Sequence, residues 1–222
     1  MKFSLLSLAF LVPLAAAHFR LDYPEARGEN EDQMPNFPCG GFSQSSKRTQ
    51  LPLSGSIPVA LTMNHIQTAT QVLLALGNDP GDNFNITLVP TFRVSGLGSF
   101  CLPHVALDKS RLGTSLTDGM NGTIQVQTSG DPTGGLYSCA DVQFFSNATY
   151  HEPSSCKNNT NIAATSFSGA AAQRNANEST SEGQPQGGSK GGSTTSMGGA
   201  APLQTAAWGV LGAAIAGSIV VL

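Results

Sequence analysis

The stretch Gly122-Thr-Ile-Gln-Val-Gln-Thr128, followed by Leu136-Tyr-Ser-Cys-Ala-Asp-Val-Gln-Phe144, decides the fold class. Apolar and polar residues alternate through much of both segments, which is the period of a strand with one buried face. Gly130-Asp-Pro-Thr-Gly-Gly135 lies between them, and such clusters of Gly, Pro and Asp are typical of turns. The sequence therefore predicts two strands joined by a turn.

The same apolar alternation recurs at Ile57–Met63 and at Asn85–Val89. Turn-forming residues break the chain between these segments, as in Asn78–Asn83. Helix is weakly supported, and only Val105–Leu112 is consistent with one short helical turn. Many short strands at this spacing predict an all-β chain folded as an antiparallel β-sandwich.

Composition limits the function classes. The chain has 222 residues with a net charge of −3, and only 11% of its residues are charged. A nucleic-acid binder would normally present a basic surface, so we expect no nucleic-acid partner. Hydrophobic residues make up 40%, enough for one core but not for several membrane spans. We expect one folded domain, residues 18–161.

The N-terminal residues 1–17 have the pattern of a secretory signal peptide. Lys2 precedes an apolar run that closes with three alanines, Ala15 to Ala17. The run is shorter than the about 20 apolar residues that a membrane-spanning helix needs. Cleavage after Ala17 would make His18 the mature N-terminus.

The C-terminal part predicts a lipid anchor. Residues 162–199 are rich in Ser, Gly and Asn, as in a flexible linker, and residues 200–222 end in an uncharged apolar tail. This is the pattern of a glycosylphosphatidylinositol (GPI) signal, whose tail is removed. The alternative, a peptide span, would normally carry Lys or Arg on its cytoplasmic side. We therefore expect the protein on the outer leaflet of the plasma membrane.

Cysteines and sequons fit a secreted glycoprotein. Four cysteines predict two disulfides but leave three pairings open: Cys39, Cys101, Cys139 and Cys156. Five Asn-x-Ser/Thr sequons are each expected at the surface: Asn85, Asn121, Asn147, Asn158 and Asn177.

The candidate metal ligands begin with His18. After cleavage its α-amino nitrogen and an imidazole nitrogen could chelate one ion, and a second imidazole would complete a T-shaped set of three nitrogens. Nitrogen-rich tetragonal coordination suits Cu(II). His65, His104 and His151 are the candidates for the second imidazole, and His65 is favoured because it ends the predicted strand Ile57–Met63.

Several motifs resemble one family. They are His18-Phe-Arg-Leu-Asp-Tyr-Pro-Glu-Ala-Arg-Gly28, Pro38-Cys-Gly-Gly41, Met63-Asn-His65 and Ser138-Cys-Ala-Asp-Val142. Together they resemble the fungal copper-acquisition-factor family, which is related in structure to lytic polysaccharide monooxygenases. The resemblance runs from His18 to about Cys156, and the GPI signal fits the same family.

The resemblance implies an immunoglobulin-like β-sandwich that binds one Cu²⁺ ion in a histidine brace. The implied ligands are the α-amino group and imidazole of His18, the imidazole of His65 and the carboxylate of Asp141. The residues alone do not single out Asp141 from Asp118 or Asp131. A carboxylate ligand would favour Cu(II) over Cu(I).

Two functions compete. The first is a cell-surface protein, more consistent with a non-enzyme, that captures Cu(II) for acquisition or homeostasis, with a plasma-membrane copper transporter as its expected partner. The second is a copper-dependent monooxygenase acting on cell-wall glycans. The chain's single tryptophan, Trp208, lies in the predicted tail, so the domain lacks the aromatic face expected of the enzyme. A metal-free wall or adhesion module would leave His18 and His65 unexplained.

Overall fold

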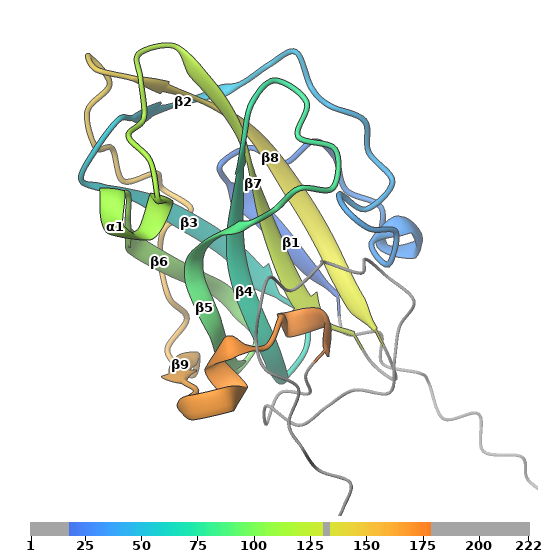
Figure 1. Ribbon diagram of the computed structural model, residues 1–222. Helices are drawn as coiled ribbons and strands as arrows, with labels where there is room; N and C mark the ends of the chain where they lie inside the picture. Colours follow the sequence, from blue (N-terminus) through green and yellow to red (C-terminus); the bar gives the residue numbers. More distant parts are fainter. Residues whose placement is uncertain (1–17, 131–133, 179–222) are drawn as a thin grey trace, which may run out of the picture. The chain divides into compact units, whose positions relative to one another are not determined.

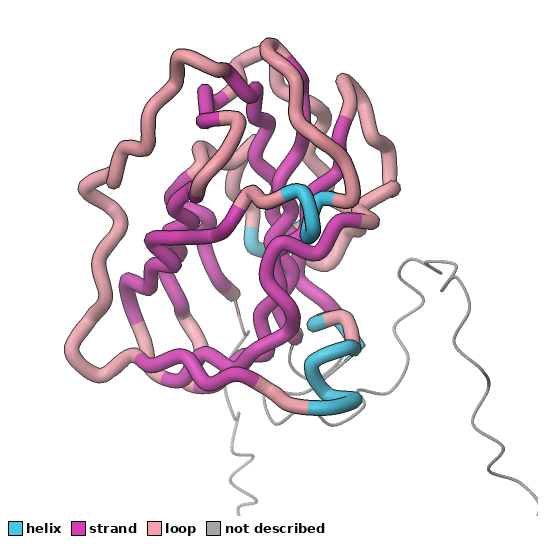
Figure 2. Tube along the Cα trace, turned by 60° about the vertical axis from the view of Figure 1, so that its left-hand side comes forward, coloured by secondary structure: helices cyan, strands magenta, loops and turns pink. Residues whose placement is uncertain are grey.

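The computed structural model of the chain describes residues 18–130 and 134–178, whose strands form two sheets around one core (Figure 1). The three-stranded sheet has the order β1 (Phe19–Tyr23), β3 (Ser56–Met63), β6 (Gly98–Ala106). The six-stranded sheet has the order β2 (Thr49–Pro52), β8 (Gly135–Phe145), β7 (Met120–Ser129), β4 (Gln67–Leu76), β5 (Ile86–Ser95), β9 (Ala163–Ser166). Figure 2 shows strands joined by long loops in this unit and only short helical segments.

The predicted β-sandwich is confirmed, and the four predicted strands correspond to β3, β5, β7 and β8. All but one of the strand pairs are antiparallel; the exception is the parallel pair of β2 and β8. The predicted helical turn is α1 (Lys109–Leu112), which Asp108 caps by accepting from the Arg111 N–H. The prediction of Val105–Leu112 starts too early, because Val105 and Ala106 belong to β6.

The alternation along β8 separates two faces of the six-stranded sheet. Ala140, Val142 and Phe144 point into the core between the sheets, and each is 0% exposed. Cys139 points the other way, into a small apolar cluster with Leu73, Ala75, Phe84 and Cys39. Over Asp141 of β8 and Gln125 of β7, this outer face is covered by the segment of residues 24–48, which follows β1.

Two disulfides hold covering segments on the sheets, as the cysteine count predicts. Cys39–Cys139 ties the covering segment 24–48 to β8, and Cys101–Cys156 ties the segment after β8 to β6. The structure thus selects one of the three pairings that the sequence left open.

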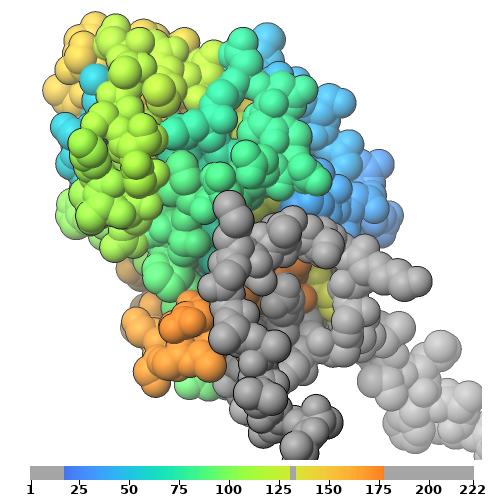
Figure 3. All heavy atoms as spheres, in the orientation of Figure 1, coloured from blue at the N-terminus to red at the C-terminus, as the bar shows by residue number. Residues whose placement is uncertain are grey.

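The ordered unit extends beyond the expected boundary at Asn161. β9 pairs with β5, and the short 3₁₀ helices η2 (Gly169–Gln173) and η3 (Ala176–Glu178) follow it, in orange at the lower edge of Figure 3. Ala176 and Asn177 are buried, at 0% and 8% exposure. Part of the expected linker therefore belongs to the folded unit, because its residues pack on the six-stranded sheet.

The expected signal peptide (residues 1–17), the rest of the expected linker and the expected tail (200–222) lie outside the described residues. Within residues 18–130 and 134–178, no helix is long and apolar enough to span a membrane.

Candidate metal centre

The register of the three-stranded sheet brings His18 next to His65. Phe19 on β1 is paired with Met63 on β3, and beyond this pair the N–H of Asn64 donates to the carbonyl of His18 at 3.1 Å. His65 is the next residue along the chain. The two histidines thus extend neighbouring strands at one end of the sandwich, which we call the histidine edge.

The imidazole of His18 is held by Glu31, the first residue of the 3₁₀ helix η1 (Glu31–Gln33). Its Nε2 lies 3.1 Å from the carbonyl oxygen of Glu31. Because a carbonyl can only accept, Nε2 carries the proton and the lone pair of the neutral ring is on Nδ1. Nδ1 is also the ring nitrogen that can share one ion with the α-amino nitrogen of the same residue.

The imidazole of His65 is held in the opposite sense. Its Nδ1 donates to the carbonyl oxygen of Gln67 at 2.7 Å, so the lone pair of its neutral ring is on Nε2. Metal-binding histidines commonly donate their other ring N–H to a backbone carbonyl, which fixes the tautomer and the ring orientation. Both histidines of this edge have that arrangement.

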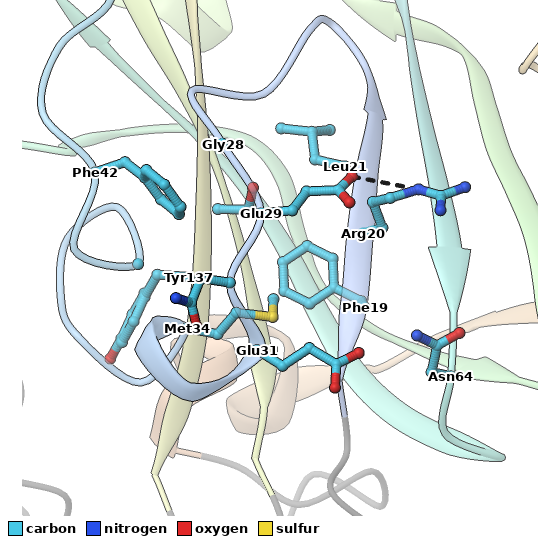
Figure 4. A pocket seen from close by; sticks show the side chains of 13 residues that line it. Phe19, Arg20, Leu21, Gly28, Glu29, Glu31, Met34, Phe42, Asn64 and Tyr137 are labelled. Carbon is cyan, nitrogen blue, oxygen red and sulfur yellow. Dashed lines mark ion pairs between the residues drawn. The ribbon is translucent and has the colours of Figure 1, made fainter.

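A cavity of about 100 Å³ lies between β1 and the residues that follow Arg27, and its lining includes Glu31, which holds the His18 ring (Figure 4). Phe19, Met34 and Tyr137 line it together with charged groups. Arg20 forms an ion pair with Glu29 at 3.4 Å, and the Glu31 carboxylate lies 3.8 Å from His18 Nδ1. A carboxylate as near as that of Glu31 favours a cation at the histidine edge.

Asp141 lies elsewhere, on the outer face of the six-stranded sheet. Its side chain is 0% exposed and accepts from Arg27 through two nitrogens, at 2.8 and 2.9 Å. The Ser45 N–H and the Thr123 hydroxyl donate to the same carboxylate, at 2.7 and 2.8 Å. Burial raises the pKa of this carboxyl, but the hydrogen bonds from Arg27, Ser45 and Thr123 outweigh it and hold the pKa below its ordinary value.

The structure therefore does not bring Asp141 to the two histidines, and its predicted role as a ligand gains no support. Both carboxylate oxygens already accept hydrogen bonds from Arg27. The side chain also points away from the core between the two sheets. Among the described residues, no three His, Cys, Asp or Glu side chains form a group able to hold a metal. Of the other two carboxylates, Asp118 accepts from Ser146, and Asp131 is outside the described residues.

The other two histidines lie away from the histidine edge. His104 is on β6, where its neighbour Val105 pairs with Ile57 at the opposite end of β3, and its ring stacks on Tyr150 at a centroid distance of 5.2 Å. His151 is exposed in the segment after β8. The choice of His65 from the sequence thus agrees with the geometry of the sheet.

Sequence reasoning missed the groups that orient these side chains. The carbonyls of Glu31 and Gln67 are backbone atoms, for which no residue type gives a signal. Arg27, the partner of Asp141, was within the quoted motif His18–Gly28, so a buried Arg–Asp pair could have been considered.

Comparison with known proteins gives a match to the family model of BIM1-like copper acquisition factors over residues 16–161. An uncharacterized protein of Aspergillus fumigatus is 58% identical over the whole of both chains. A lytic polysaccharide monooxygenase-like protein X325 of Yarrowia lipolytica is 33% identical, covering 77% of this chain and 65% of its own. A copper acquisition factor BIM1 of Cryptococcus neoformans is 30% identical, covering 74% of this chain and 77% of its own.

Proposed function

The chain belongs to the BIM1-like copper acquisition factor family, and on that premise we propose that it captures one Cu²⁺ ion at the cell surface. In this proposal the α-amino group and Nδ1 of His18 act together with Nε2 of His65. The ion is the protein's cargo, held for acquisition or homeostasis.

The observation that carries the proposal is the opposite orientation of the two rings at the histidine edge. His18 donates through Nε2 and His65 donates through Nδ1, each to a backbone carbonyl. The ring nitrogens that do not donate in these two hydrogen bonds, Nδ1 of His18 and Nε2 of His65, are the two that a brace starting from a terminal histidine requires. Three nitrogen donors fit Cu(II), which also heads the affinity order of the divalent first-row metals.

We leave Asp141 out of the proposed ligand set. As a ligand it would have to give up Arg27, whose side chain is 8% exposed, and so leave a buried guanidinium without its counter-ion. A structural role explains Asp141 better, since it holds the covering segment 24–48 against β7 and β8 through Arg27, Ser45 and Thr123.

The competing function is oxidative cleavage of glycans, in keeping with the name of the relative from Yarrowia lipolytica. A glycan-binding face would need exposed aromatic rings that stack on sugars. Among the described residues the exposed large apolar side chains are Ile66, Leu97 and Tyr150. Tyr150 stacks on His104, far from the histidine edge, so the surface around the proposed copper site favours capture over catalysis.

The cell-surface location is part of the proposal and rests on the expected signal peptide and GPI signal. Cleavage after Ala17 supplies the amine of His18, and the anchor keeps the protein next to a plasma-membrane copper transporter. Release of the protein from intact cells by phosphatidylinositol-specific phospholipase C would support the anchor. Recovery of the Trp208 peptide from the mature protein would contradict it.

Growth under copper limitation tests the function. Deletion of the gene should impair growth on copper-depleted medium, and added copper should restore it. His65→Ala should reproduce the defect, whereas the matched variant His104→Ala should grow like the wild type. If the copper-loaded protein and ascorbate release oxidised oligosaccharides from cellulose, chitin, xylan or glucan in a His65-dependent manner, the enzyme is the correct alternative.

A further inference from the structure

We propose that the protein carries N-linked glycans at Asn85, Asn147 and Asn158 and none at Asn121 or Asn177, although all five begin a sequon. The expectation that every sequon lies at the surface is wrong for Asn177, which is 8% exposed. The surroundings of each side-chain nitrogen separate the five positions.

Glycan transfer places a large group on one atom. The Asn Nδ2 forms a bond to C1 of the first sugar of a lipid-diphosphate-linked oligosaccharide, while the C1–O bond to the diphosphate breaks. The amide loses one proton and the lipid diphosphate leaves. The product keeps the amide carbonyl as a hydrogen-bond acceptor and one N–H as a donor. The sugar on Nδ2 must point into solvent in the folded protein.

Asn177 cannot meet this requirement in the fold. Its Nδ2 donates to the hydroxyl of Tyr137 at 2.9 Å, and Tyr137 is itself only 2% exposed. The adjacent strand is so near that a Cβ added to Gly135 would lie 2.4 Å from the Asn177 Cβ. A sugar on Asn177 would therefore push the η3 segment off the six-stranded sheet.

Asn121 is also engaged through its nitrogen. It lies within β7 opposite Gln143, and its Nδ2 donates to the side-chain oxygen of Asn78. Its own side-chain oxygen is buried, and its backbone carbonyl accepts from Gly77 at 2.8 Å. Only one hydrogen is left on a glycosylated Nδ2, and the sugar on the same atom would crowd Asn78 in the contact that joins β7 to the turn after β4.

The remaining three asparagines are exposed. Asn85 ends the loop before β5, and Asn147 lies in the turn after β8. Asn158 is fixed through its oxygen, which accepts from the Cys101 N–H at 2.8 Å. This hydrogen bond is compatible with glycosylation because the amide carbonyl survives the reaction.

Two of the glycans would lie at the end of the sandwich opposite the histidine edge. β4 starts two residues after His65 and runs to Leu76, and Leu74 near its far end pairs with Ile86 beside Asn85. The start of β8 lies near the start of β4, because Gly135 pairs with Ser129, whose hydroxyl accepts from the Ala69 N–H. The other end of β8, at Phe145, comes two residues before Asn147. The glycans at Asn85 and Asn147 thus leave the histidine edge accessible.

Isotope-coded deglycosylation of the full chain secreted from a fungal host tests the assignment. Peptide N-glycosidase F in H₂¹⁸O converts each glycosylated Asn to ¹⁸O-labelled Asp, which peptide mapping detects. We expect label at Asn85, Asn147 and Asn158 and unlabelled asparagine at Asn121 and Asn177. Label at Asn121 or Asn177, or an unlabelled Asn85, Asn147 or Asn158, would overturn the assignment.

Single Asn→Gln variants give a second readout. Asn85→Gln, Asn147→Gln and Asn158→Gln should each lower the intact mass of the secreted protein by one glycan. Asn177→Gln and Asn121→Gln should leave the glycan mass unchanged, and a loss of one glycan in either would refute the proposal. Copper binding is measured separately, so failure of this assignment leaves the proposed function untouched.

Discussion

Replacing Asp141 by asparagine distinguishes a structural carboxylate from a copper ligand. The change keeps the size and one acceptor but removes the charge that pairs with Arg27, whose side chain is 8% exposed. The guanidinium of Arg48, 3.8 Å from the same carboxylate, also loses its counter-charge. Removing one partner of a buried ion pair typically costs about 3–5 kcal/mol, because the other charge stays buried and unpaired.

Urea unfolding of the copper-free protein measures this loss. With a slope of about 2 kcal/mol per molar urea, a loss of 4 kcal/mol moves the midpoint down by about 2 M. Asp82→Asn, in the exposed loop before β5, is the matched control and should leave the midpoint nearly unchanged. Copper affinity of the folded Asp141→Asn protein should stay close to that of the wild type.

The opposite pair of results would refute this reasoning. If Asp141→Asn unfolds at the same urea concentration as Asp82→Asn but binds copper much more weakly, Asp141 is a ligand. The sequence-based prediction would then be correct and the Arg27 pair of minor importance.

Three further outcomes follow from the same structure. Because its pKa is lowered, the ionised Asp141 carboxylate stabilises the fold fully above about pH 5 and progressively less as the pH falls towards that lowered pKa. The stabilities of the wild type and Asp141→Asn should therefore converge in acid unfolding experiments. A constant difference in stability down to low pH would contradict this. Cys101→Ser/Cys156→Ser opens a loop of sequence separation 55 and should lower the free energy of unfolding by about 4 kcal/mol, measured by thermal or urea unfolding; no loss would mean that this disulfide does not constrain the chain. Gly96→Ala should destabilise more than Gly55→Ala, since both have positive φ but only at Gly96 would the new Cβ lie 2.2 Å from the Asn161 carbonyl oxygen; equal melting temperatures would count against that packing.

The sandwich was predictable because its strands carry the period of a half-buried sheet. β7 and β8 show it most clearly, and they form the centre of the larger sheet with β4. The strand β4 itself was not identified, since eight of its ten residues are buried and a strand covered on both faces shows little alternation. β9 was missed because its four residues, Ala163–Ser166, are all exposed and resemble a polar linker.

The site was predictable in part for a related reason. His65 was favoured because it ends a predicted strand, whereas its approach to His18 depends on the pairing of β1 with β3, which was not predicted from the sequence. Asp141 was transferred from a motif, although Cys139 and Asp141 share the face of β8 opposite to Ala140 and Val142. The alternation along β8 is enough to place this carboxylate on the face away from the core. Its partners Arg27 and Ser45 could not be predicted, because they come from the covering segment 24–48, which has no repeating pattern.

Copper titration of the mature protein followed by electron paramagnetic resonance tests the central claim most directly. The protein beginning at His18 is compared with the same protein carrying one added N-terminal glycine, with His65→Ala and with the control His104→Ala. We expect one tight Cu(II) per chain with nitrogen ligands in the wild type and in His104→Ala. Loss of a group that only orients a ligand typically weakens metal binding by about 10–100-fold. The added residue and His65→Ala should each weaken binding by more than this. Equal affinity in all four proteins, or a second tight site in the wild type, would contradict a brace formed by His18 and His65.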